Sequence, residues 1–280
     1  MNPELVNRLV PFRAEALRRG IPPREVEAWI AATRPCATLV TRGDGPVVGR
    51  FGGPLLLPAD APDPWFPLLA TLDCAALPEE VTGLPLPADG RLLLFGFPEL
   101  PNYMGPAGEV VYIPEGTPVE ERTAKNNYAY EELICEQLPQ EELRLAPDVS
   151  LASHFLAASE ERGGEVVTLP GHPHAGELAE TWEQTYGDIV VDGPLHIGGY
   201  ASHECTETDP VLDAAEEAQD GRRFRGDATE LPAPEGWVLL AQWDIGLDGR
   251  EGSTLHWVIP RQDLAERRFD RAHVSFFWNP

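Results

Sequence analysis

The sequence RFGGPLLLPADAPDPWFPLLATLD, residues 50–73, decides how the chain folds around it. Gly52 and Gly53 permit positive φ and a close approach of the backbone to its neighbours. The prolines that follow fix φ and push the residues before them toward extended conformations, so the first part of the stretch is predicted to be extended and irregular rather than helical. The apolar residues after it require a buried core, and they predict a strand that ends near Asp73.

Length and charge limit the classes of partner. A chain of 280 residues can bury a large core as one domain or as two closely packed halves. The formal net charge of −25 excludes nucleic acid and anionic membranes as partners, because both attract basic surfaces. No segment approaches the roughly 18 apolar residues of a membrane span, and the amino terminus does not have the pattern of a signal peptide. A cytoplasmic protein with a protein or small-molecule partner is therefore expected.

Helices are predicted at the amino terminus and in the second half of the chain. Residues 3–19 have helical apolar spacing that Pro11 must kink or split, and a second helix is predicted over residues 22–30. Apolar residues four apart predict a helix over residues 177–186, and a charged helix followed by a turn is predicted over residues 209–225. These helices are expected to flank a sheet.

Strands are predicted where short apolar runs lie between turn residues. Residues 37–41 and 46–50 are predicted to form a hairpin, and residues 90–97 and 109–114 are predicted to be further strands. Residues 149–161 are instead predicted to form a helix. The fold class expected is α+β, with mostly antiparallel sheets and short helices.

The two halves of the chain resemble each other. Residues 69–73 (LATLD) align without a gap with residues 240–244 (LAQWD), and each segment is followed by a second apolar strand. A duplication explains this pattern, although two buried hairpins in any α+β domain can look alike. We therefore predict amino-terminal helices over residues 1–34 and one domain over residues 35–280, with half-units of about 35–146 and 147–280.

Six segments of this chain resemble motifs of the bacterial YwqG-like family, a domain of unknown function. They are FGGPLLLP (51–58), PLLATLD (67–73), GRLLLFGF (90–97), EVVYIP (109–114), LHIGGYASHECTETDP (195–210) and LLAQWDIG (239–246). Thr71 replaces the glutamine usual in that family, and Ala201 replaces the proline after Gly-Tyr. The resemblance implies an α+β fold of two related half-units with a cleft between them, and it implies no activity.

Metal and nucleophile chemistry find little support in the sequence. His172 and His174, and likewise His196, His203 and Cys205, do not have the spacing of a zinc site. The four cysteines form no CxxC pair and are predicted to be reduced and mostly buried. The chain has neither the G-x-S-x-G motif of a hydrolase nor a P-loop. No metal and no cofactor are expected.

Paired carboxylates offer a different chemistry. Asp73 and Asp244 end the two related strands, and they would approach each other if the halves packed about a pseudo-twofold axis. Two carboxylates in one cleft can act as general acid and base, or they can bind a cation. The alternative is that each aspartate caps the turn after its strand.

The leading functional hypothesis is a binding or interaction protein whose cleft lies between the halves. The residues predicted to line or adjoin this cleft are Gly52, Gly53, Asp73, His196, Gly199, Tyr200, Gln242 and Asp244. A hydrolase that uses Asp73 with Asp244 is one alternative. An immunity-type protein that neutralises a basic partner is the other, since strong acidity suits such a partner.

Overall fold

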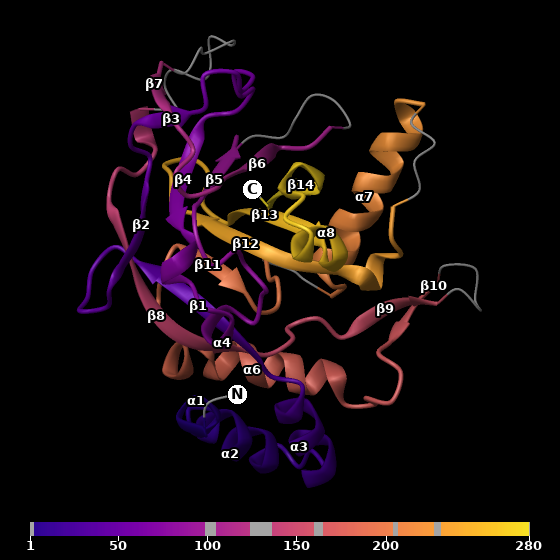
Figure 1. Cartoon of the computed structure of the whole chain (residues 1–280). Helices are drawn as coiled ribbons and strands as arrows, with labels where there is room; N and C mark the ends of the chain where they lie inside the picture. The colour runs from indigo at the N-terminus through magenta and orange to yellow at the C-terminus, as the bar shows by residue number, and fades with distance from the viewer. Residues whose placement is uncertain are drawn as a thin grey trace.

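The structure, a computed structural model, describes residues 3–98, 105–123, 136–159, 165–203, 207–226 and 231–279. Helices and antiparallel sheet are mixed along the chain, as an α+β fold requires (Figure 1). The helices in the described residues are α1 (Pro3–Asn7), α2 (Val10–Arg18), α3 (Pro23–Ala31), α4 (Glu79–Thr82), α6 (Ala175–Ile189), α7 (Pro210–Phe224) and α8 (Arg261–Ala265). The strands are β1 (Arg34–Val40), β2 (Val47–Phe51), β3 (Leu55–Leu57), β4 (Leu68–Asp73), β5 (Arg91–Gly96), β6 (Gly108–Ile113), β7 (Glu120–Arg122), β8 (Glu142–Ser150), β9 (Leu156–Ser159), β10 (Glu165–Thr168), β11 (Leu195–Gly198), β12 (Trp237–Ile245), β13 (Ser253–Pro260) and β14 (His273–Trp278).

Ten strands form one sheet in the order β14-β13-β12-β11-β1-β8-β2-β4-β5-β6. Every neighbouring pair in this sheet is antiparallel. The sheet curls until its ends approach each other, and the Ala107 amide beside β6 donates to the Val274 carbonyl of β14 at 2.7 Å. The two shorter sheets pair β3 with β7 and β9 with β10.

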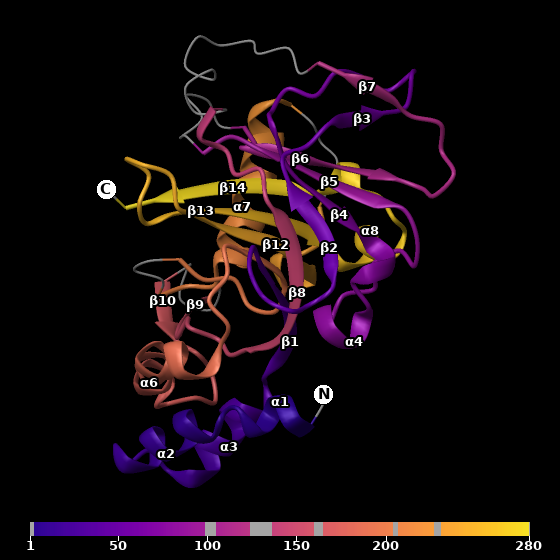
Figure 2. The ribbon, with the colours of Figure 1, turned by 90° about the vertical axis from the view of Figure 1, so that its left-hand side faces the viewer.

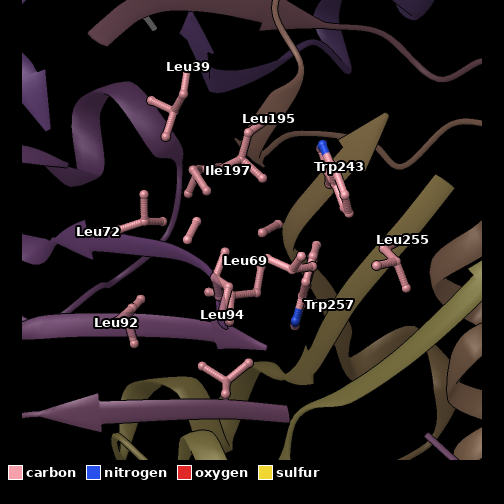
Figure 3. Packing of buried hydrophobic residues seen from close by; sticks show 14 of the residues in the cluster. Leu39, Leu69, Leu72, Leu92, Leu94, Leu195, Ile197, Trp243, Leu255 and Trp257 are labelled. Carbon is pink, nitrogen blue, oxygen red and sulfur yellow. The ribbon is translucent and has the colours of Figure 1, made fainter. Parts of the chain in front are cut away.

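The main core fills the inside of this curl (Figure 3). Leu72 of β4, Leu195 of β11 and Trp243 of β12 all belong to this cluster, so the core joins strands from both halves of the sheet. The Trp257 indole of β13 donates to the Phe95 carbonyl of β5 at 3.0 Å and ties the two ends together. The side chains that alternate with these residues point to the outer face of the sheet.

The predicted hairpin of residues 37–41 and 46–50 is wrong. Both strands exist, but β8 lies between them and pairs antiparallel with each. The predicted helix over residues 149–161 is also wrong, because β8 runs to Ser150 and β9 begins at Leu156. The continuous ladder from β8 to β1 overrides the local helical pattern, as tertiary pairing often does.

The amino-terminal helices pack on α6 and away from the main core (Figures 1 and 2). The rings of Phe12 in α2 and Trp182 in α6 meet edge to face, with centroids 6.2 Å apart. Helix α7 covers the outer face of β12 and β13 through a third apolar cluster. Within the residues that the structure describes, we find no helix with the length and apolar character of a membrane span.

The hairpins β4–β5 and β12–β13 share an irregularity. Each first strand contains a register shift, between Leu68 and Ala70 in β4 and between Leu239 and Ala241 in β12. After the shift, Thr71 and Asp73 alternate with core residues in β4, as Gln242 and Asp244 do in β12. The bulge therefore sets which side chains reach the outer face.

Candidate pocket on the outer face of the sheet

A row of polar side chains crosses four neighbouring strands on the outer face. Thr38 of β1 pairs with His196 of β11, His196 pairs with Gln242 of β12, and Gln242 pairs with His256 of β13. The side chains of such paired residues lie about 5 Å apart on one face of the sheet. The strand register alone thus brings together four polar groups from distant parts of the sequence.

Thr38, His196 and Gln242 of this row line a pocket of about 550 Å³, which we call the Asp244 pocket. Its wall on one side is α6, which contributes Trp182, Glu183 and Tyr186. The end of β8 and the segment after β11 supply further lining, including Ser153 and Tyr200. The pocket therefore lies between the sheet and α6, and all of its lining residues except Cys36 and Thr38 of β1 come from the second half of the chain.

Asp244 follows Gln242 by two residues in β12 and presents its carboxylate to the pocket. Its side chain is 49% exposed, whereas that of His196 is 14% exposed. The Gln242 amide donates from Nε2 to Asp244 Oδ1 at 2.9 Å, and His196 Nε2 lies 3.3 Å from Asp244 Oδ2. Gln242 thus orients the carboxylate, and about half of its side chain stays exposed.

Gln242 is itself held in place by the segment after β11. The Ser202 amide donates to Gln242 Oε1 at 2.9 Å, and Gln242 Nε2 donates to Ser202 Oγ at 3.2 Å. His256 Nε2 donates to the Ser202 carbonyl at 2.9 Å. Burial lowers the pKa of His256 to about 4, so at neutral pH the ring is uncharged and serves as a fixed donor.

Asp148 lies beneath the row and is fully buried. Its carboxylate accepts the amides of Val149 and Val191, both at 2.8 Å, and the Thr38 hydroxyl at 3.0 Å. The Arg8 guanidinium lies 3.1 Å away. Burial raises the pKa of Asp148, while the three hydrogen-bond donors and the positive charge of Arg8 favour the charged form. With a permanently charged guanidinium beside it, Asp148 is a carboxylate at neutral pH.

Two more titratable groups line the pocket. Burial, followed by the carboxylate of Asp244, raises the pKa of Tyr186, so the phenol stays neutral at physiological pH. Burial and the nearby Asp148 also raise the pKa of Cys36. The Cys36 thiol is therefore no nucleophile, because the thiolate is the reactive form.

The structure separates the predicted site residues into two groups. His196, Tyr200, Gln242 and Asp244 all line the Asp244 pocket. Gly199 adjoins it, since a Cβ on Gly199 would meet the lining residues Cys36 and Ser150, at 2.9 Å each. These residues gather around a pocket that is lined by β1 and by the second half of the chain.

Asp73, Gly52 and Gly53 belong to the other half. Asp73 lines a second pocket of about 320 Å³, the Asp73 pocket, and strands β11, β1, β8 and β2 separate its strand from that of Asp244. Its Oδ1 accepts the Ala75 amide at 3.0 Å, so Asp73 caps a turn. Gly52 and Gly53 have φ of 57° and 93°, which confirms the predicted positive values. Their neighbours are Gln140 and Arg50.

The sequence did not mark Thr38, Asp148 or His256 as members of this site. The only signal for His256 is its alternation with Thr254 in β13, which matches Gln242 and Asp244 in β12. Thr38 and Asp148 join the site only because β1 lies between β11 and β8, whereas the predicted hairpin paired β1 with β2.

The histidines considered for a metal are engaged elsewhere. Among the described residues, no group of three or more His, Cys, Asp or Glu side chains is arranged to bind a metal ion. The His172 ring packs on Trp29, and His174 Nδ1 lies 3.2 Å from Glu177. His203 stacks on Phe277, while Cys205 lies outside the described residues. The cysteines Cys36 and Cys74 are free and buried, as predicted.

Comparison with curated proteins finds no match to this chain. A protein family does match, and the match includes part of β2, all of the polar strands β11 to β13 and most of β14. Over residues 49–277, the chain belongs to the family of the domain of unknown function DUF1963.

Proposed function

We propose that this protein is a cytosolic binding protein whose Asp244 pocket takes a small ligand with a cationic group, an ammonium or a guanidinium. The observation that carries the proposal is the half-exposed carboxylate of Asp244 in a pocket whose described lining includes no lysine or arginine. A cation that reaches Asp244 gains a charge-assisted hydrogen bond, whereas an anion meets Asp244 and Glu183 without a compensating positive side chain from that lining.

Three further features support a small polar ligand. The volume of about 550 Å³ is within the range that encloses small molecules. Tyr186 contributes aromatic surface, which attracts cations, whereas the Tyr200 ring already has the Arg34 guanidinium over it, 3.9 Å from its centroid. The Ser153 hydroxyl is buried and lines the pocket without a hydrogen-bond partner among the described residues. A buried hydroxyl of this kind gains free energy when a ligand supplies a partner.

We also infer that the chain is an internal duplication of half-units 35–146 and 147–280, as in the YwqG-like group that it resembles. The strand order supports this, because it reads β1-β11-β12-β13-β14 in one direction and β8-β2-β4-β5-β6 in the other. The first strands of the two half-units are then exchanged between them. This exchange explains why β8 lies between β1 and β2.

The local registers agree with the duplication. Arg50 pairs with Thr71 just before Gly52 and Gly53, as His196 pairs with Gln242 just before Gly198 and Gly199. All four glycines have positive φ. The bulges of β4 and β12 also fall at equivalent positions.

In this alignment the Asp73 pocket is the counterpart of the Asp244 pocket. Thr71 takes the place of Gln242, and Leu93 takes the place of His256. Hydrolysis by Asp73 together with Asp244 has no support in this arrangement, because the two carboxylates line different pockets. A substitution of Asp73 is therefore a matched control for the same substitution of Asp244 in a binding experiment.

Calorimetric titration with agmatine and putrescine tests the proposal, at low ionic strength so that screening is weak. We expect one ligand per chain, with Asp244→Asn weakening binding by about tenfold or more, the usual effect of losing a charged hydrogen-bond partner. Asp73→Asn should leave the affinity unchanged. If neither amine binds at millimolar concentration, or if Asp244→Asn binds as the unaltered protein does, the proposal is wrong.

A further inference from the structure

Thr38 connects the buried Asp148 carboxylate to the imidazole of His196. The Thr38 hydroxyl lies 3.0 Å from Asp148 Oδ2 and 3.2 Å from His196 Nδ1. It is almost fully buried, so these two groups are its hydrogen-bond partners among the described residues. A hydroxyl has one proton to donate, and the direction of that one bond decides the state of the ring.

Asp148 determines which of its two neighbours receives the proton of the Thr38 hydroxyl. A carboxylate only accepts hydrogen bonds: the amides of Val149 and Val191 donate to Asp148, and the Arg8 guanidinium forms an ion pair with it. The Thr38 proton therefore points to Asp148. The Thr38 oxygen then has only lone pairs to offer His196, so His196 Nδ1 must be the donor.

We infer that Thr38 is a positioning residue that holds neutral His196 as the Nδ1–H tautomer, so that an unprotonated Nε2 faces Asp244 and the pocket. His196 Nε2 and Asp244 Oδ2, 3.3 Å apart, are then two acceptors side by side. The opposite tautomer would donate Nε2–H to Asp244 and occupy the carboxylate oxygen that a ligand would use.

The pair of acceptors formed by His196 Nε2 and Asp244 Oδ2 narrows the class of ligand that the pocket can bind, an inference that rests on the proposed function. Two adjacent acceptors are best satisfied by a nitrogen that carries at least two N–H groups, as in a primary ammonium or a guanidinium. A quaternary ammonium has no N–H and leaves both acceptors without a partner. The pocket is therefore expected to select agmatine over choline.

The decisive experiment needs no ligand. Protein labelled with ¹⁵N-histidine is studied by long-range ¹H–¹⁵N correlation, at a pH above which the imidazole signals no longer change, and the His196 signals are assigned from their loss in His196→Gln. We expect Nδ1 to be protonated and Nε2 to be unprotonated. Thr38→Val should reverse the tautomer, because Nδ1–H loses its acceptor, and Thr38→Ser should preserve it.

The unaltered protein showing an Nε2–H tautomer would overturn the inference, as would an Nδ1–H tautomer that persists in Thr38→Val. Near-ultraviolet circular dichroism verifies that each variant is folded, and Thr38→Ser provides the test if Thr38→Val does not fold. In a second measurement, agmatine should bind Thr38→Val about tenfold more weakly and Thr38→Ser normally. A correct tautomer without agmatine binding would overturn only the ligand assignment.

Discussion

Arg8 and Asp148 form an ion pair between the amino-terminal helices and the buried end of β8, with Arg8 Nη1 3.1 Å from Asp148 Oδ1. The same guanidinium donates to the carbonyls of Pro147 and Ile189. Arg8 lies in the break between α1 and α2 and outside the matched residues 49–277. The break thus places one charged side chain under the Asp244 pocket.

We predict that Arg8→Met destabilises the protein by about 3–5 kcal/mol, because it leaves the fully buried Asp148 carboxylate without its counterion. Urea denaturation at pH 7 measures the change. The double variant Arg8→Met with Asp148→Asn should recover part of the loss, because the uncompensated charge is gone. A cost below about 1 kcal/mol for Arg8→Met would mean that the pair behaves as an exposed one.

Local sequence patterns predicted several helices and strands correctly, although they missed β8 and placed a helix over residues 149–161. The strand that ends at Asp73 is β4, and the runs at residues 90–97 and 109–114 contain β5 and β6. These elements follow from apolar spacing and from glycine and proline at their ends, which act within a few residues. The positive φ of Gly52 and Gly53 is local in the same sense.

The pairing of strands was not predictable in this way. β1 and β2 looked like a hairpin because only six residues separate them, yet β8 pairs with both from about a hundred residues further along the chain. The candidate site depends on this pairing, since Thr38 meets His196 and Asp148 only after β1 lies between β11 and β8. Residue types therefore identified Gln242, Asp244 and His196, while the register identified their partners.

The buried His256 predicts a loss of stability in mild acid. Its pKa is lowered to about 4 in the folded protein, against an ordinary value of about 6.5. The unfolded chain therefore binds more protons between these two values, so stability falls as the pH falls from about 6.5 to about 4 and is unaffected by this group above that range. At pH 5 the loss from His256 is about 2 kcal/mol.

Urea denaturation at pH 7 and pH 5 tests this prediction. His256→Gln retains a side-chain donor without a titrating ring, so its loss of stability between the two pH values should be about 2 kcal/mol smaller than in the unaltered protein. Comparing the two differences removes the contribution of other groups, including His154, whose pKa burial also lowers. Equal differences in both proteins would show that His256 does not titrate in this way.

The final prediction concerns Gly198, which ends β11 beneath the pocket with φ of 74°. A Cβ at this position would lie 2.0 Å from the Thr82 carbonyl oxygen, a backbone atom that cannot rotate away. Gly20 follows α2 with φ of 85°, and a Cβ there would meet nothing within 4 Å. The two glycines thus share the backbone strain but differ in the space around them.

We expect Gly20→Ala to cost about 1–2 kcal/mol, the usual cost of a side chain in the left-handed region. Gly198→Ala should cost about 1–3 kcal/mol more, because the strand or α4 must also shift to admit the methyl group. Urea denaturation of both variants gives the two free energies of unfolding. The shift should also displace His196, two residues away, and weaken agmatine binding in Gly198→Ala but not in Gly20→Ala. Equal costs for the two substitutions would mean that α4 moves freely, and the close approach of Thr82 would then play no part in holding the pocket.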